Sequence, residues 1–133
     1  MANDGYTQYQ QNQLSMASPA KLLLAAYDGA LRFCRIGLEK MREGRFDEQS
    51  INLNKALAVI CELLSTLNEE ANPTLVARLR SLYLYVIEKI AHANLTADQA
   101  DLNEAMKILA SLRESWAEAD RILQRESLQE EAA

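Results

Sequence analysis

Residues that interrupt helices are scarce in this chain, and that scarcity constrains its fold more than any other feature. The 133 residues include only four glycines and two prolines. Each proline directly follows a residue that can cap a helix: Ser18 precedes Pro19, and Asn72 precedes Pro73. A capping side chain followed by proline at the first helical position is typical of a helix start. With so little material for turns, the sequence favours a few long helices over a sheet-rich fold.

These signals, together with the spacing of the apolar residues, predict the positions of the helices. We expect four of them, over residues 19–43, 47–70, 73–94 and roughly 98–124. Gly44 ends the first helix, and Asp47 is the expected cap of the second. Thr96, with Gln99 three residues later, resembles a capping box for the fourth helix, and Asp98 is the alternative cap.

Short connections between long helices favour antiparallel neighbours. The expected fold class is therefore all-α, an antiparallel up-down four-helix bundle with an extended N-terminal segment. The bundle is expected over residues 18–125, with a frayed tail over residues 126–133. Residues 1–17 are rich in Gln and Asn but also contain several apolar side chains. That composition fits either a disordered tail or an extended segment that docks reversibly on the bundle.

Apolar stripes identify the core-facing side of three predicted helices. The stripe of the fourth helix is the most regular, because its members step by three or four residues throughout: Leu102, Ala105, Leu109, Leu112, Trp116, Ala119 and Leu123. The second and third helices carry comparable stripes, and we assign all three to the core.

The first predicted helix differs because its apolar residues surround most of its circumference. When the residues are placed 100° apart around the helix axis, one set of apolar residues forms the expected inner arc, which faces the core. A second set lies well outside that arc: Leu22, Ala26, Phe33 and Ile36, with Gly29 among them. A mid-helix glycine often marks the close approach of another element. The candidates for covering this second set are the neighbouring helices, the chain's own N-terminal segment, a second copy and a foreign chain.

Charge and hydropathy exclude several classes of partner. Residues 1–45 carry six Lys and Arg against four Asp and Glu, a net charge of +2, whereas residues 46–133 carry eight against fifteen, a net charge of −7. No cluster of positive charge suits nucleic acid or anionic lipid, so we expect neither partner. The N-terminus lacks a signal-peptide pattern, and no apolar run is long enough for a membrane span. We therefore expect a cytoplasmic protein without membrane insertion, in which Cys34 and Cys61 stay reduced.

Patterns that support catalysis or metal binding are absent from the sequence. His92 is the only histidine, and Glu88 precedes it by four residues instead of the three found in Glu-x-x-His motifs of di-metal bundles. A histidine phosphotransfer domain is the enzymatic alternative, but His92 lies close to a helix end and lacks the expected following lysine. No nucleophile–base arrangement, phosphate loop or zinc pattern is present. We expect no enzymatic activity, no metal and no cofactor.

Taken as a set, several short segments of the sequence are specific enough to indicate a protein family. They are Tyr9-Gln10-Gln11-Asn12-Gln13, Ala17-Ser18-Pro19, Lys21-Leu22-Leu23, Tyr27-Asp28-Gly29-Ala30, Asn54-Lys55-Ala56, Glu62-Leu63, Leu82-Tyr83, Ala93-Asn94 and Trp116. In this order and spacing, over about residues 6–120, they closely resemble the flagellar secretion chaperone family FliS. The resemblance implies a cytoplasmic four-helix-bundle chaperone that binds the C-terminal segment of newly made flagellin. Such a chaperone prevents premature polymerisation and keeps flagellin competent for flagellar type III secretion, with export-apparatus components as further partners.

The candidate binding residues come from two sources. Spacing on the first helix assigns to a flagellin-binding groove the set Leu22, Ala26, Gly29, Phe33 and Ile36. The resemblance adds Tyr27 and Tyr83, although Tyr27 fits the core equally well. It also implies that the N-terminal segment occupies part of the surface and moves when flagellin arrives, with Tyr6, Tyr9 and Leu14 as the cap. The competing interpretation is a structural or regulatory bundle whose second apolar face forms a homodimer.

Overall fold

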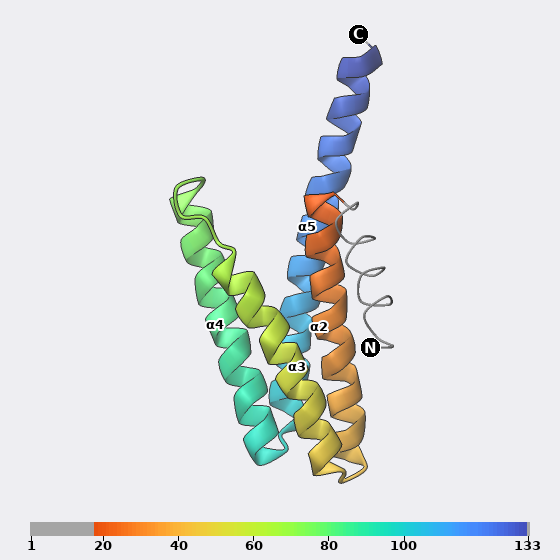
Figure 1. Ribbon diagram of the computed structural model, residues 1–133, viewed down its shortest axis with the longest axis vertical. Helices are drawn as coiled ribbons and strands as arrows, with labels where there is room; N and C mark the ends of the chain where they lie inside the picture. Colours follow the sequence, from red (N-terminus) through yellow and green to blue (C-terminus); the bar gives the residue numbers. More distant parts are fainter. Residues whose placement is uncertain (1–17, 133) are drawn as a thin grey trace, which may run out of the picture.

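The computed structural model describes residues 18–132, and in this range the chain forms four α-helices (Figure 1). They are α2 (Pro19–Arg42), α3 (Phe46–Ser65), α4 (Pro73–Thr96) and α5 (Gln99–Ala132). Successive helices run in opposite directions, and α2 packs on α3 and α5 while α4 packs on the same two helices. The all-α antiparallel up-down bundle predicted from the sequence is confirmed. The predicted N-terminal segment, residues 1–17, lies outside the described residues.

The predicted starts of α2 and α4 are confirmed by their caps. The Ser18 hydroxyl oxygen accepts a hydrogen bond from the Lys21 backbone N–H at 3.2 Å, and the Asn72 side-chain oxygen accepts one from Leu75 at 3.2 Å. Gly44 follows the end of α2 with a φ of +72°, a left-handed conformation that glycine adopts without steric cost.

The caps of the other two helices, α3 and α5, show which of the candidate cap residues takes that position at each helix start. Helix α3 begins at Phe46 after Arg45, so Asp47 lies in the first turn and is not the cap as predicted. Asp98 caps α5, since its carboxylate accepts a hydrogen bond from the Asp101 N–H at 3.2 Å. Thr96 instead donates its hydroxyl to the His92 carbonyl within α4.

Two helix ends differ from the prediction. Helix α3 ends at Ser65 instead of near residue 70, and the Asn68 side chain accepts a hydrogen bond from the Glu70 N–H in the following turn. Asparagine favours this kind of turn because its side chain competes with the helical backbone. Helix α5 continues to Ala132, past the predicted end near residue 124. The side chains of residues 121–132 are all exposed.

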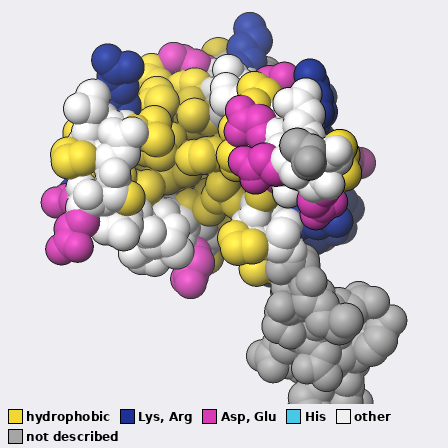
Figure 2. Space-filling model, turned by 90° about the horizontal axis from the view of Figure 1, so that it is seen from above, with side chains coloured by type: hydrophobic (Ala, Val, Ile, Leu, Met, Phe, Trp, Pro, Cys, Tyr) yellow, Lys and Arg dark blue, Asp and Glu magenta, His cyan; other side chains and the backbone are white. Residues whose placement is uncertain are grey.

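The core is formed by one arc of each helix and is sealed most tightly at the end where α2 meets α3 and α4 meets α5. There Gln49 is 1% exposed, and its amide nitrogen donates to the side-chain and backbone oxygens of Asn94 at 2.9 and 3.1 Å. At the opposite end, α3 and α4 diverge from α2 and α5 (Figure 1). Viewed from that end, a broad field of apolar side chains is visible between the helices (Figure 2). None of the helices in the described range is long and apolar enough to cross a membrane.

Candidate functional site

An apolar groove runs between α2 and α3 at the divergent end of the bundle. Its volume is about 980 Å³. The first two turns of α2 and the last two of α3 supply its walls: Pro19, Leu22, Leu23, Ala26, Ala58, Val59, Glu62, Leu63 and Thr66. Only Glu62 and Thr66 are polar, and they lie four residues apart on the α3 side. The groove can therefore take up apolar side chains of a partner, with polar contacts confined to one rim.

Helix α2 exposes apolar residues here because α3 diverges from it. Leu22 is 37% exposed although it lies on the flank of α2 that faces α3, and Ala26, one turn further along, is half-buried. These are two of the five groove residues that spacing assigned to this flank. The apolar surface outside the inner arc of α2 is thus only partly covered by the neighbouring helices.

The other three residues predicted from spacing continue along the same flank of α2. Gly29 lies one turn beyond Ala26, and a Cβ added to it would meet no described atom within 4 Å. Phe33 and Ile36 follow and are half-buried. The close approach expected at Gly29 occurs instead at Gly37, where an added Cβ would lie 2.5 Å from Leu53 Cδ2.

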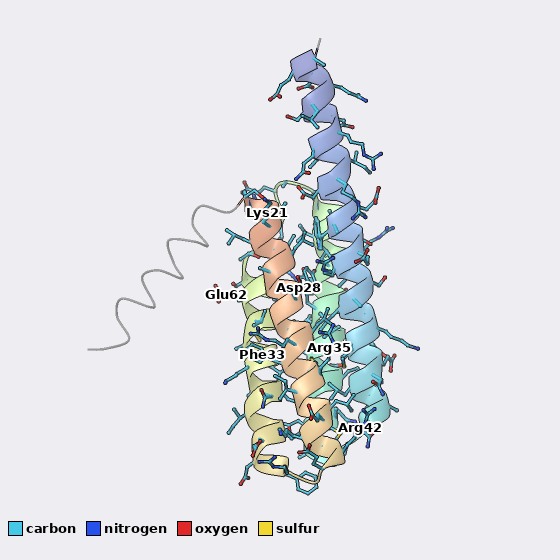
Figure 3. All side chains as sticks on the ribbon, turned by 90° about the vertical axis from the view of Figure 1, so that its right-hand side faces the viewer. Lys21, Asp28, Phe33, Arg35, Arg42 and Glu62 are labelled. Carbon is cyan, nitrogen blue, oxygen red and sulfur yellow. The ribbon has the colours of Figure 1, made fainter. Side chains whose placement is uncertain are left out.

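Phe33 lies on the same flank of α2, beyond the residues that line the groove, and two cationic side chains approach its ring. The Arg32 guanidinium carbon lies 5.4 Å from the centroid of the Phe33 ring, and Lys55 Nζ of α3 lies 5.7 Å from it. Cations over an aromatic face are attracted by the ring quadrupole. Figure 3 shows Phe33 on the α3 side of α2 and Arg35 on the opposite side, toward α5.

The two tyrosines assigned to the groove by family resemblance lie in the core. Tyr27 is 0% exposed and Tyr83 is 2% exposed, so neither side chain lines the groove. Their hydroxyl oxygens are 2.5 Å apart, and the Trp116 indole N–H donates to the Tyr27 oxygen at 3.1 Å. Burial raises the pKa of both phenols, and for Tyr27 the hydrogen bond with Tyr83 raises it further. This polar cluster ties α2, α4 and α5 together beside the groove.

Two parts of the surface were missed by sequence reasoning. One is the α3 wall, which is recognisable in retrospect because Ala58, Glu62 and Thr66 recur every four residues beside the core stripe. The other is a smaller groove of about 230 Å³ between the start of α2 and α5. It is lined by Pro19, Ala20, Leu23, Trp116, Ala119, Asp120 and Leu123. The sequence signal for this smaller groove was the apolar stripe of the fourth predicted helix, α5. That stripe continues beyond the part of α5 that α4 can cover.

The predicted cap residues Tyr6, Tyr9 and Leu14 lie outside the described part of the chain. Their contact with either groove therefore stays a prediction.

One group of side chains in the described range has ligand atoms close enough to hold a metal ion, namely His92, Asp98 and Asp101. Each carboxylate already has a structural role. Asp98 caps α5, and Asp101 pairs with Lys89 at 3.3 Å and with His92. Hydrogen bonding to His92 and Lys89 lowers the pKa of Asp101. The cluster therefore joins the end of α4 to the start of α5, and we assign no metal to it.

Comparison with known proteins gives consistent matches over most of the chain. The family described as Flagellar protein FliS matches residues 1–123. The chain is 33% identical over 114 residues to the flagellar secretion chaperone FliS of Bacillus subtilis, covering 86% of this chain and 84% of that protein. It is 31% identical over 116 residues to the corresponding chaperone of Campylobacter jejuni, covering 87% and 91% of the two chains. The four-helix bundle and these matches show that the chain belongs to the FliS family of flagellar secretion chaperones.

Proposed function

We propose that this protein is a cytoplasmic export chaperone that binds the disordered C-terminal segment of flagellin in the groove between α2 and α3. Binding prevents premature polymerisation of flagellin and keeps it competent for flagellar type III secretion. Membership of a family of secretion chaperones, which is not an enzyme family, makes a flagellar protein the expected partner. The observation that carries the proposal is the exposed apolar groove beside α2.

The shape and chemistry of the groove suit an amphipathic helix that folds as it binds. Such a helix lays apolar residues spaced by three or four positions into a groove and leaves its polar face in solvent. Coupled folding costs several kcal/mol in ordering, so affinity must come from many modest apolar contacts. The walls of the α2–α3 groove, apolar except at one rim, provide such contacts along both helices.

The N-terminal segment, residues 1–17, is proposed to cover part of this surface when no client is present. A self-docked segment would lower the apparent affinity for flagellin in proportion to the fraction of closed molecules. In return, the free chaperone would not expose a large apolar patch to other proteins.

The proposal is tested by placing a charge in the groove. Leu22→Glu should weaken binding of the flagellin C-terminal segment at least tenfold in titration calorimetry, because the carboxylate would lose water without gaining a partner. Since Leu22 is already 37% exposed, the variant should keep the wild-type circular dichroism and melting curve. It should also fail to suppress flagellin polymerisation in a light-scattering assay. Phe33→Glu, further along the same flank, should weaken binding in the same direction.

Leu84→Glu is the matched control, since Leu84 is a 47% exposed leucine on α4 that does not line the groove. It should bind like the wild type. Equal losses in Leu22→Glu and Leu84→Glu, or full affinity in a folded Leu22→Glu protein, would refute the assignment of the groove. A dimer that persists at low concentration and ignores the flagellin segment would favour the homodimer interpretation.

A further inference from the structure

The outer face of α2 carries four charged residues whose order stays the same when the helix is reversed and the signs are exchanged. From the N-terminal end they are Lys21, Asp28, Arg32 and Glu39. Lys21 and Glu39 stand nine residues before and after position 30, and Asp28 and Arg32 stand two residues before and after it. At 100° per residue, all four lie within an arc of about 40°. In Figure 3, α2 lies in front, with Lys21 and Asp28 following one another along it, whereas Arg35 points toward α5.

This charged row is available to another molecule. Within the described residues, none of Lys21, Arg32 and Glu39 lies within 4.0 Å of an oppositely charged group. Asp28 accepts hydrogen bonds from Arg113 of α5 at 2.9 and 3.4 Å, one on each carboxylate oxygen. Each of these oxygens has a second lone pair and can accept a further hydrogen bond. The row can therefore form new ion pairs without breaking one of the bundle.

Apolar residues that the neighbouring helices leave partly uncovered lie directly beside the charged row, on its α3 side. They are Leu22, Ala25, Gly29 and Ile36. Leu22 is 37% exposed, Ala25 is exposed, and the other two are half-buried. A Cβ added to Gly29 would meet no described atom within 4 Å, so packing within the bundle does not require this poor helix former. The small residues Ala25 and Gly29 would let the backbone of a further helix approach α2 closely.

A second copy of this chain is the occupant that the charge order fits. In a dimer with a two-fold axis, a contact from one residue to another is repeated in the opposite sense. When two α2 helices lie antiparallel about such an axis at position 30, each residue faces the one equally far from position 30 in the other copy. Lys21 then faces Glu39, Asp28 faces Arg32, and each ion pair forms twice. Charges that flank an apolar contact between helices set its partner and its orientation.

We propose that free molecules form a weak antiparallel dimer through the outer face of α2, and that this dimer and the complex with flagellin exclude each other. Leu22 belongs both to the dimer contact and to the lining of the α2–α3 groove, so a second copy on α2 covers one rim of the groove. A contact between one pair of helices is smaller than the roughly 1,200 Å² of stable interfaces, so we expect a Kd on the order of 10–100 μM. The exclusion rests on the proposed function, whereas the dimer does not.

Exchanging charges between two variants tests the dimer. Lys21→Glu makes both ends of the row negative and Glu39→Lys makes both positive, so each variant alone should dimerise about fivefold to twentyfold more weakly in sedimentation equilibrium at low salt. An equimolar mixture should regain wild-type dimerisation, because opposite charges then face each other again. Both substitutions suit the dipole of α2, since they place an acid in its first turn and a base in its last, so the fold should be kept. Lys107→Glu, an exposed reversal on α5, is the control and should dimerise like the wild type.

Each part of the proposal has its own contradicting result. A wild type that stays monomeric at about 1 mM, roughly ten times the weakest expected Kd, would overturn the dimer. A mixture as monomeric as its two components, or an equal loss in Lys107→Glu, would overturn the antiparallel contact. Adding the flagellin C-terminal segment should convert wild-type dimers into 1:1 complexes, and dimers that retain the bound segment would overturn the exclusion. A segment that does not bind at all would refute the proposed function and the exclusion with it, while the charge exchange still decides the dimer.

Discussion

At the scale of single residues, the most constrained feature is the buried polar cluster of Tyr27, Tyr83 and Trp116. Tyr27 is its centre, since its oxygen contacts the Tyr83 hydroxyl and accepts from the Trp116 indole N–H. A buried polar group that loses its partner costs more than the net energy of the hydrogen bond, because it has already lost water. The cluster therefore fixes the rotation of α2, and with it the face that Leu22 and Ala26 present to the groove.

Removing the central hydroxyl should destabilise the fold more than removing the peripheral one. Tyr27→Phe leaves the Trp116 indole N–H without its acceptor and the Tyr83 hydroxyl without its partner, and should lower the free energy of unfolding by about 2–3 kcal/mol, whereas Tyr83→Phe should cost about 1 kcal/mol. Urea denaturation followed by circular dichroism measures both. Tyr85→Phe is the control, because the exposed Tyr85 hydroxyl bonds Glu104 at the surface and its loss should change stability by less than about 0.5 kcal/mol. Equal losses in the free energy of unfolding for Tyr27→Phe and Tyr85→Phe would show that the buried cluster contributes no more to stability than the exposed hydrogen bond does.

The sequence alone could not assign these residues to the cluster. Family resemblance identified Tyr27, Tyr83 and Trp116 as significant, and periodicity placed each on an apolar stripe. Which of them touch depends on the rotation of three separate helices, which no local pattern encodes. The groove residues predicted from spacing could be placed from the sequence. Leu22 and Ala26 share one flank of one helix, and helical geometry alone brings such residues together.

At the scale of helices, the sequence predicted starts better than ends. Ser18-Pro19 and Asn72-Pro73 combine a cap with a fixed proline φ, so their signals are strong and local. The sequence signals for helix ends are weaker, because each end depends on competition between continuing the helix and starting a turn. Helix α5 has no Gly or Pro after Gln99 and consists of strong helix formers, so it continues where its apolar stripe stops. Side-chain pairs such as Glu118 with Arg121 support this extension.

Two glycines in α2 should respond oppositely to the same substitution. Gly29→Ala should raise the free energy of unfolding by up to about 1 kcal/mol, because alanine is the better helix former and the added methyl meets no described atom within 4 Å. Gly37→Ala should lower it by about 1–2 kcal/mol, since its methyl would lie 2.5 Å from Cδ2 and 2.8 Å from Cγ of the fully buried Leu53. Thermal melting of both variants checks the prediction, and stabilisation by Gly37→Ala would mean that α2 and α3 are packed less closely than the structure shows.

At the scale of the whole molecule, the bundle is tightly closed at one end and open at the other. The closed end is held by the Gln49–Asn94 contacts, whereas the open end exposes apolar side chains between diverging helices (Figure 2). The sequence predicted an excess of apolar surface around α2 but could not show where it stays uncovered. That location depends on the tilt of α3 away from α2, which results from packing among all four helices.

The central claim is that flagellin binds at the open end, beside α2, and photo-crosslinking with purified full-length flagellin tests it most directly. A benzophenone amino acid replaces exposed Ala58 on the α3 wall of the groove or, as the control, Leu84 on α4. After irradiation, mass spectrometry identifies the linked flagellin peptide. We predict that position 58 links to the C-terminal segment of flagellin and that position 84 gives no link. Efficient linking from position 84, or linking of position 58 to another region of flagellin, would contradict the account.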